Sequence, residues 1–253
     1  MKYSLSNIWQ MARPTPDFNS HIVSKAQNDY PTITSIKTKT KDGNTQIQKM
    51  EYDHRGNLNM QTVGHQKYHY KINENEKCAE TLIFQGKYLI GRHSYIYDND
   101  ERLIKIFEFG GRNQKLKQLH TFEYNIHNQL SGHHIFSAYL NDYLSRSFYQ
   151  WTNENISAKI TFNHKKEKIK TLFTFDTQRN TNYQHPLFIR SVQGWNKNNI
   201  LQKKQTICES TSGRENEIID FKIDFHKSGL IKDITGSNGQ KTAFSYSRIF
   251  SIL

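Results

Sequence analysis

The residues of this sequence with the most chemical potential are its 12 histidines, which could bind a metal ion or transfer protons near neutral pH. His65 and His69 are four residues apart on a predicted strand, so they share a face but lie about 13 Å apart at the rise of a strand. A site could assemble across strands, for instance from His120, His127 and His133, but no spacing requires one. The sequence therefore predicts no metal site.

Motifs for nucleophilic or nucleotide chemistry are also missing. The stretch from Gly236 to Thr242 resembles a phosphate-binding loop, but two residues separate its glycines and Gln240 lies between Gly239 and Lys241. A strand is predicted to follow it where a phosphate loop opens a helix, so we interpret it as a hairpin turn. No catalytic residue and no cofactor is predicted. Carboxylate pairs that act on glycans assemble across strands without a linear signature, so a glycan-active enzyme stays open as a third alternative.

The charge of the chain favours acidic partners. It carries 35 Lys and Arg against 23 Asp and Glu, a net charge of +12, with 13% aromatic residues. Basic residues cluster near positions 165 and 203, and tryptophans stand at the ends of two predicted strands. Cations and aromatic rings together are typical of interface anchors. The candidate binding residues are Lys165, Lys166, Lys168, Lys203, Lys204, Trp151 and Trp195.

The two cysteines, Cys78 and Cys208, lie far apart and outside any CxxC pair, which excludes a readable zinc or redox motif. We expect two buried free thiols, with one disulfide as the alternative if the protein is secreted. No apolar run approaches the ~20 residues of a membrane span, and the first residues lack the apolar stretch of a signal peptide. We therefore expect a cytoplasmic protein that does not bind membranes.

The elements that must position these residues are short strands. From Thr32 onward the apolar pattern has a period of two, and Asp42-Gly43 between two such runs predicts a hairpin with a type I′ turn. The same pattern recurs: an aromatic residue ends a strand, Asp, Asn or another small polar residue follows, and an aliphatic five to seven residues after the aromatic opens the next strand. The copies are Tyr52 to Leu58, Tyr97 to Leu103, Tyr124 to Leu130, Trp151 to Ile156, Phe162 to Ile169, Trp195 to Ile200 and Phe225 to Leu230.

These turns divide the chain into two regions. Residues 1–31 form an expected irregular arm with three of the four prolines and one short helix near Ser20 to Gln27, and residues 32–253 form one β-hairpin meander domain. About seventeen strands are expected. A helix is an alternative only at Tyr139 to Gln150, where we favour strands. The predicted fold class is all-β, an antiparallel meander of many short hairpins.

Two of the copies resemble the YD repeats of the RHS family, which read roughly Tyr-Asp, two variable residues, Gly, Arg and an aliphatic. Tyr52-Asp53-His54-Arg55-Gly56-Asn57-Leu58 keeps the Gly, and Tyr97-Asp98-Asn99-Asp100-Glu101-Arg102-Leu103 keeps the Arg. The motif covers about a third of the chain. The resemblance implies a curved, single-layer or barrel-like sheet, in a chain too short to form the toxin-enclosing shell of that family.

The resemblance also implies a class of function, because compact bacterial proteins of this kind are often binding partners that include immunity proteins. We therefore expect a non-enzymatic protein-binding module, in its most specific form an immunity-type protein that neutralises a cognate toxin by steric occlusion. The alternative is a polyanion-binding module for nucleic acid or glycan.

Overall fold

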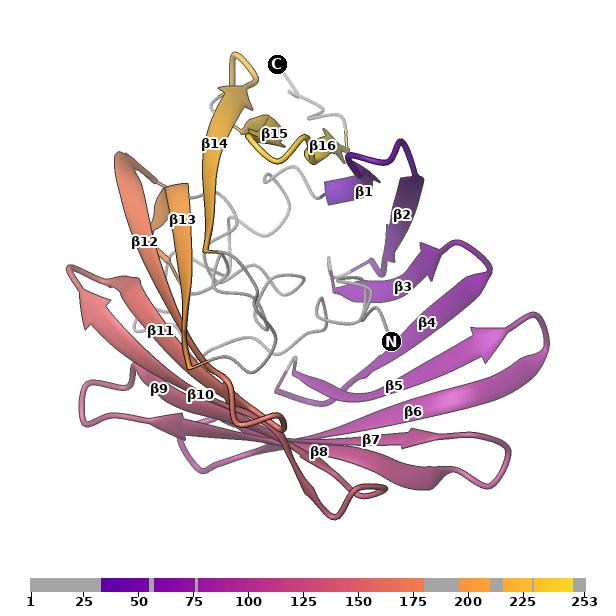
Figure 1. Cartoon of the computed structure of the whole chain (residues 1–253). Coiled ribbons are helices and arrows are strands. Elements are labelled where there is room, and N and C mark those ends of the chain that lie inside the picture. The colour runs from indigo at the N-terminus through magenta and orange to yellow at the C-terminus, as the bar shows by residue number, and fades with distance from the viewer. Residues whose placement is uncertain are drawn as a thin grey trace.

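The chain folds as one closed antiparallel β-barrel, shown end-on as a ring of strands in Figure 1. This computed structural model describes residues 33–54, 57–75, 77–179, 196–209, 216–228 and 230–247. Within them there are sixteen strands. The strands are β1 (Ile33–Lys39), β2 (Thr45–Tyr52), β3 (Leu58–Val63), β4 (Gln66–Ile72), β5 (Cys78–Gln85), β6 (Tyr88–Tyr97), β7 (Leu103–Gly110), β8 (Lys115–Tyr124), β9 (Leu130–Ser137), β10 (Asp142–Thr152), β11 (Asn155–Asn163), β12 (Lys168–Arg179), β13 (Asn198–Glu209), β14 (Glu217–Phe225), β15 (Ile231–Gly236) and β16 (Lys241–Tyr246).

Every strand pairs with its neighbours in the sequence, and the pairing of β1 with β16 closes the ring. Ile36 lies opposite Phe244 and Thr38 opposite Thr242 at this seam. Closure removes the two free edges that an open sheet would expose to other chains. The expected all-β meander is confirmed, and so is its barrel-like curvature. The segment predicted as strand or helix, Tyr139 to Gln150, forms a turn and most of β10.

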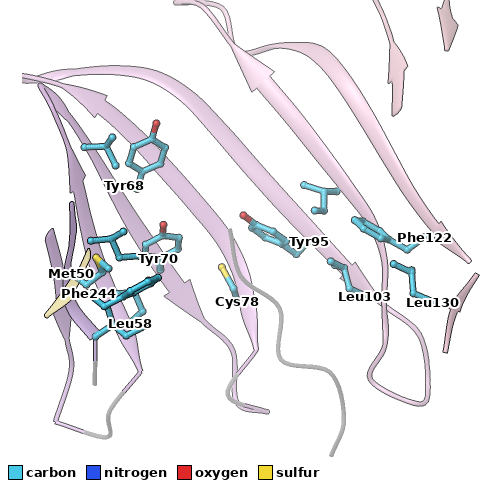
Figure 2. Packing of buried hydrophobic residues seen from close by; sticks show 14 of the residues in the cluster. Met50, Leu58, Tyr68, Tyr70, Cys78, Tyr95, Leu103, Phe122, Leu130 and Phe244 are labelled. Carbon is cyan, nitrogen blue, oxygen red and sulfur yellow. The ribbon is translucent and has the colours of Figure 1, made fainter. Parts of the chain in front are cut away.

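The hydrophobic core lies on the inner face of the barrel. Buried residues from strands all around the ring form one cluster, which a closed sheet permits only on its inside. Figure 2 shows part of it, with Tyr70, Tyr95 and Phe122 on β4, β6 and β8, which are alternate strands of the ring. Because side chains alternate between the faces of a strand, the residues between these positions point outward. Residues that pair across two strands lie on the same face of the sheet. A side chain therefore points inward when the residues it pairs with point inward.

The turns repeat one hydrogen-bonded geometry. At β6–β7, the Asp98 N–H donates to Arg102 O and the Glu101 N–H donates to Asp98 O, while Glu101 has a φ of 58°. This is a type I turn followed by a left-handed residue, the usual three-residue hairpin loop. The same two backbone bonds, with a left-handed residue, occur in the loops that begin at Thr40, Asn125, Asn163 and Gly236.

The loop at Asp42-Gly43 belongs to this group, so the predicted type I′ turn is wrong. Gly43 has the expected positive φ of 80°, but Asp42 is not in the left-handed region. A type I′ turn needs positive φ at both central residues, and the three-residue loop needs it only at the last. The Gly236 to Thr242 stretch is the predicted hairpin turn, with Gly239 in the left-handed position.

The Asp or Asn that opens a loop also caps it. The Asn125 Oδ1 atom accepts hydrogen bonds from the backbone N–H groups of His127 and Gln129, at 2.9 and 3.0 Å. Asp98 Oδ1 accepts the equivalent bonds from Asp100 and Arg102. The short polar side chain thus satisfies donors that the turned backbone leaves unpaired. This is the physical reason for the Asx residue in the repeat.

A Tyr or Trp at the end of the second strand closes the base of five of the described hairpins. Its ring hydroxyl or indole N–H donates to the carbonyl of the first residue of the preceding strand. The pairs are Tyr52 to Ile33 (2.7 Å), Tyr97 to Cys78 (2.9 Å), Tyr124 to Leu103 (2.9 Å), Trp151 to Leu130 (2.7 Å) and Tyr246 to Ile231 (2.9 Å). Burial raises the pKa of Tyr52 and Tyr124, so both hydroxyls keep the proton that they donate. We call this contact the hairpin latch.

Two copies of the repeat differ from the sequence-based assignment. After Phe225 the buried aliphatic is Ile231, 1% exposed, and the predicted Leu230 is only half-buried. The loop bond from the His226 N–H to Leu230 O shows that His226 stands where other copies have Asp or Asn. A further copy runs from Ile72 to Cys78, which is buried, and was missed because an aliphatic replaces the aromatic.

The predictions about the cysteines are confirmed in part. Both cysteines are free thiols, but only Cys78 is buried and Cys208 is exposed on β13. The expected arm of residues 1–31, with its helix near Ser20 to Gln27, lies outside the described residues. No stretch of the described chain forms a helix long and apolar enough to cross a membrane.

Replacing Gly43 with Val should lower the free energy of unfolding by about 1 kcal/mol or more, because a β-branched residue is strained at positive φ. A Cβ atom at this position would have no heavy atom within 4 Å, so the cost comes from the backbone alone. Urea unfolding measures it. Gly43→Asn is the matched control and should cost less, since Asn tolerates this conformation. Equal midpoints for Gly43→Val and the parent would contradict the turn assignment.

Replacing Tyr97 with Phe should remove one hairpin latch and cost about 1 kcal/mol of stability, because the Cys78 carbonyl loses its donor while the ring still packs. Tyr88→Phe is the control, since Tyr88 is exposed and forms no latch. Thermal and urea unfolding of both variants give the comparison. A loss no larger than that of the control would show that the latch contributes nothing to stability.

Candidate functional site

The outer surface of β9–β11 carries a group of large apolar side chains that the barrel does not bury. Tyr139 is 92% exposed in the turn before β10, and Phe148 and Phe162 are 42% and 38% exposed on β10 and β11. Tyr143 and Leu140 are also exposed. Exposed apolar residues that gather in this way mark interaction sites in soluble proteins. We call Tyr139, Leu140, Tyr143, Arg146, Phe148 and Phe162 the aromatic face.

Ring contacts join the aromatic face across neighbouring strands. Phe148 contacts Phe162 edge to face at 6.2 Å between ring centroids, and His134 of β9 at 5.3 Å. Phe136 contacts Tyr143 at 5.6 Å in the same geometry. Such pairs are the favoured arrangement of aromatic rings. The rings therefore form one continuous surface on a rigid sheet.

Cations lie on this surface. The Arg146 guanidinium lies 5.1 Å from the Tyr143 ring centroid, and the Lys168 ammonium lies 6.0 Å from that of Phe162. On β6 the Arg92 guanidinium lies 4.4 Å from the ring of Phe109. Cation–π contacts hold the charged groups in place without neutralising them. The face combines apolar area with positive charge, as interface anchors do.

The predicted lysines divide between the two sides of the sheet. Lys165 and Lys166 lie in the exposed β11–β12 turn, and Lys168 and Lys204 point outward from β12 and β13. Lys203 points inward, because its partners Phe173 and Ile219 belong to the inner face. The structure therefore brings Lys165, Lys166 and Lys168 to the edge of the aromatic face and separates Lys203 from them.

The predicted tryptophans are not on the aromatic face as far as the described residues extend. Trp151 is a hairpin latch: its ring packs partly buried against the core and its indole N–H donates to Leu130 O at 2.7 Å. Trp195 lies outside the described residues. The sequence analysis did not predict the aromatic face. The pattern that could have indicated it is the group of apolar residues from Tyr139 to Phe148, which does not follow the period-two alternation of a strand.

A second group of reactive side chains lies inside the barrel. Glu108 Oε1 is 3.3 Å from His120 Nε2 and 3.8 Å from His93 Nε2, and His120 Nδ1 is 3.0 Å from His133 Nε2. The ring of Phe122 stacks on His133 at 4.5 Å. A carboxylate close to several imidazoles is an arrangement that general acid–base chemistry uses. We call Glu108 and the three histidines, His93, His120 and His133, the inner His–Glu group.

The inner His–Glu group contains two of the three histidines named from the sequence as an example of a cross-strand site. His127 is not among them, because it lies in the exposed β8–β9 turn. No group of three or more His, Cys, Asp or Glu in the described part of the chain is arranged to hold a metal ion. His93 and Glu108 were missed because only the register of β6 with β7 places them opposite each other.

Comparisons with known proteins support the fold. No protein-family model and no curated protein matches the sequence. A crystal structure of a porin-like protein from Bacteroides uniformis superposes with a TM-score of 0.52 at 10% identity, covering 86% of this chain and 99% of that one. At this identity the similarity concerns the barrel fold alone.

Two further similarities are too weak to carry an argument. A porin-like protein from Bacteroides vulgatus has a TM-score of 0.48 at 10% identity, covering 86% of this chain and 99% of that one. The TcdB2-TccC3-Cdc42 structure has a TM-score of 0.27 at 9% identity, covering 76% of this chain and 12% of that one. The hairpin architecture expected from the YD resemblance is confirmed by the barrel itself.

Proposed function

We propose that this protein is a non-enzymatic binding module whose aromatic face docks on one protein partner. The observation that carries the proposal is the exposed, ring-to-ring continuity of Tyr143, Phe148 and Phe162 with Arg146 stacked on it. Aromatic residues and Arg supply most of the energy in protein interfaces. A monomer gains nothing from leaving them exposed.

The rigidity of the sheet supports docking without rearrangement. Four of the six residues of the aromatic face are on the paired strands β10 and β11, so their backbone positions are set before a partner arrives. Pre-organised anchors lose little conformational entropy on binding. The net charge of +12 and the lysines at the edge of the face favour a partner with an acidic rim, which electrostatic attraction would bring in faster.

The most specific form of the proposal is an immunity-type protein that neutralises a bacterial toxin by covering its active surface. This step rests on the YD-repeat resemblance of the turns at Asp53 and Asp98 and on no contact in the structure. Steric occlusion requires only a stable interface, and it requires no catalytic group on the barrel. The inner His–Glu group is then part of the barrel interior and not an active site.

A polyanion-binding module is the alternative, and the outer lysines favour it. Lys165, Lys166, Lys168, Lys170 and Lys204 gather on the outer side of β12 and β13 and the preceding turn, and none of them has an ion-pair partner among the described residues. Phosphate-tracking affinity would fall steeply with salt, whereas a packed protein interface would lose less. The dependence of affinity on salt therefore separates the two proposals.

The test is co-expression with the product of the neighbouring gene, which the proposal expects to be a toxin. Co-expression should yield a complex near one-to-one that survives moderate salt and abolishes toxin activity at equimolar ratio. Phe148→Ser should weaken the complex at least about tenfold, the effect of removing one interface anchor. Ile218→Ser is the matched control, because Ile218 is an exposed apolar residue on the outer face of β14, away from the aromatic face.

Three results would contradict the proposal. Equal weakening by Phe148→Ser and Ile218→Ser would show that the aromatic face is not the docking surface. Protection at far below equimolar amounts would indicate catalysis and direct attention to the inner His–Glu group. Binding to DNA or RNA that collapses with salt, without a toxin complex, would favour the polyanion alternative.

A further inference from the structure

We propose that Lys159 and Lys203, on the inner face of the barrel, bind a small oxyanion such as a phosphate or sulfate group. Lys159 of β11 lies opposite Tyr149 and Thr171, and Lys203 of β13 lies opposite Phe173 and Ile219. Paired residues share a face of the sheet, and Tyr149 and Phe173 pack against the core. Both lysines therefore point inward.

The two lysines face one region of the interior. Only β12 separates their strands, so the strands are about 10 Å apart, and both side chains extend into the same concave space. Burial, and then the positive charge of Lys203, lower the pKa of Lys159 to about 8. The charge on Lys203 is therefore close enough to disfavour the charge on Lys159. An anion held between them would reverse this effect.

The local carboxylates do not balance the pair. The Lys203 ammonium is 3.8 Å from the Glu217 carboxylate, and both side chains keep part of their surface open, 30% and 47%. The Lys159 ammonium lies 5.9 Å from the centroid of the Tyr149 ring, and no described carboxylate forms an ion pair with it. Like charges placed together inside a protein are costly unless a counter-charge joins them. One more negative group is needed here.

Hydroxyl groups beside the lysines complete an oxyanion site. Thr171 lies directly opposite Lys159, and one residue pair further along the same inner face Ser147 Oγ and Thr161 Oγ1 are 3.0 Å apart. One of these two hydroxyls donates to the other, so the second keeps a hydrogen to donate elsewhere. Two ammonium groups with hydroxyl donors suit a tetrahedral dianion, for which Lys acts as a point charge.

The ligand must reach this site through solvent, and the lysines allow it. Both Lys159 and Lys203 are half-buried, so each residue keeps part of its surface open to solvent. The site lies on the opposite side of the sheet from the aromatic face: Phe148 points outward while its neighbour Tyr149 lies beside Lys159. The inference is thus independent of the proposed docking function, and each can fail without the other.

Inorganic sulfate is the probe, because its charge stays constant across the pH range in which Lys159 titrates. Isothermal titration calorimetry at fixed ionic strength should show saturable one-to-one binding to the full-length protein. Lys159→Met should weaken it at least about tenfold. Lys170→Met is the matched control and should bind as the parent does, since Lys170 points outward from β12.

The pH dependence gives a second, independent readout. Sulfate affinity of the parent should fall as the pH rises from about 7 to about 9.5, because Lys159 loses its proton in that range. Among the described residues, the other charged or titratable groups on this part of the inner face are Lys203, Glu217 and Tyr149, and burial raises the pKa of Tyr149. Lys159→Arg keeps its charge throughout, so it should keep its affinity at about pH 9.5.

The Arg variant keeps the inference testable if Lys159→Met fails to fold. Unchanged affinity in Lys159→Met, equal losses in Lys159→Met and Lys170→Met, or no saturable binding to the parent would each overturn the inference. The same pH profile for the parent and Lys159→Arg would also overturn it, since the profile would then belong to another group. Binding of inorganic phosphate in the same assay, competing with sulfate, would support the oxyanion class.

Discussion

The hydrogen bond from the aromatic residue at the end of one strand to the first carbonyl of its hairpin sets the geometry of this barrel. In Tyr97, Tyr124 and Trp151 the ring fills the base of the hairpin while its polar tip closes it. After Tyr97 and Tyr124 the Asx cap and the left-handed residue reverse the chain within three residues, whereas after Trp151 the chain turns through Asn153 and Glu154, both at positive φ. A fixed reversal defines the register of the next strand, and the register decides which face each later side chain occupies.

Because the register is fixed, successive residues on one strand lie on opposite faces of the sheet and belong to different proposed sites. Along β10, Arg146 and Phe148 point outward, whereas Ser147 and Tyr149 point inward. The outer set forms a rigid apolar and cationic surface suited to a protein partner. The inner set lies beside a pair of lysines suited to an oxyanion. One short stretch of sequence thus supplies parts of two proposed sites on opposite sides of a single sheet.

Closure of the barrel makes the outer surface usable for recognition. An open meander of this length would leave two strand edges able to pair with any other strand. The β1–β16 pairing removes them, so contacts through backbone hydrogen bonds are no longer available at the seam. The proposed recognition would then use side chains, which supports the aromatic face and the outer lysines of β12 and β13 as the candidate surfaces.

The sequence alone determined the strands, the turns and their antiparallel order, because period-two alternation and Asp, Asn or Gly at the reversals are local properties. Leu58, Leu103 and Leu130 were predicted to open strands, and they are the first residues of β3, β7 and β9. The tertiary structure decided the closure, the type of the Asp42-Gly43 turn, and the grouping of His93, Glu108, His120 and His133. It also placed Lys203 and Lys204 on opposite faces and left Phe148 outside the core. The faces of these side chains depend on which residues pair across strands, and a shift of one residue in the register would move them to the opposite face.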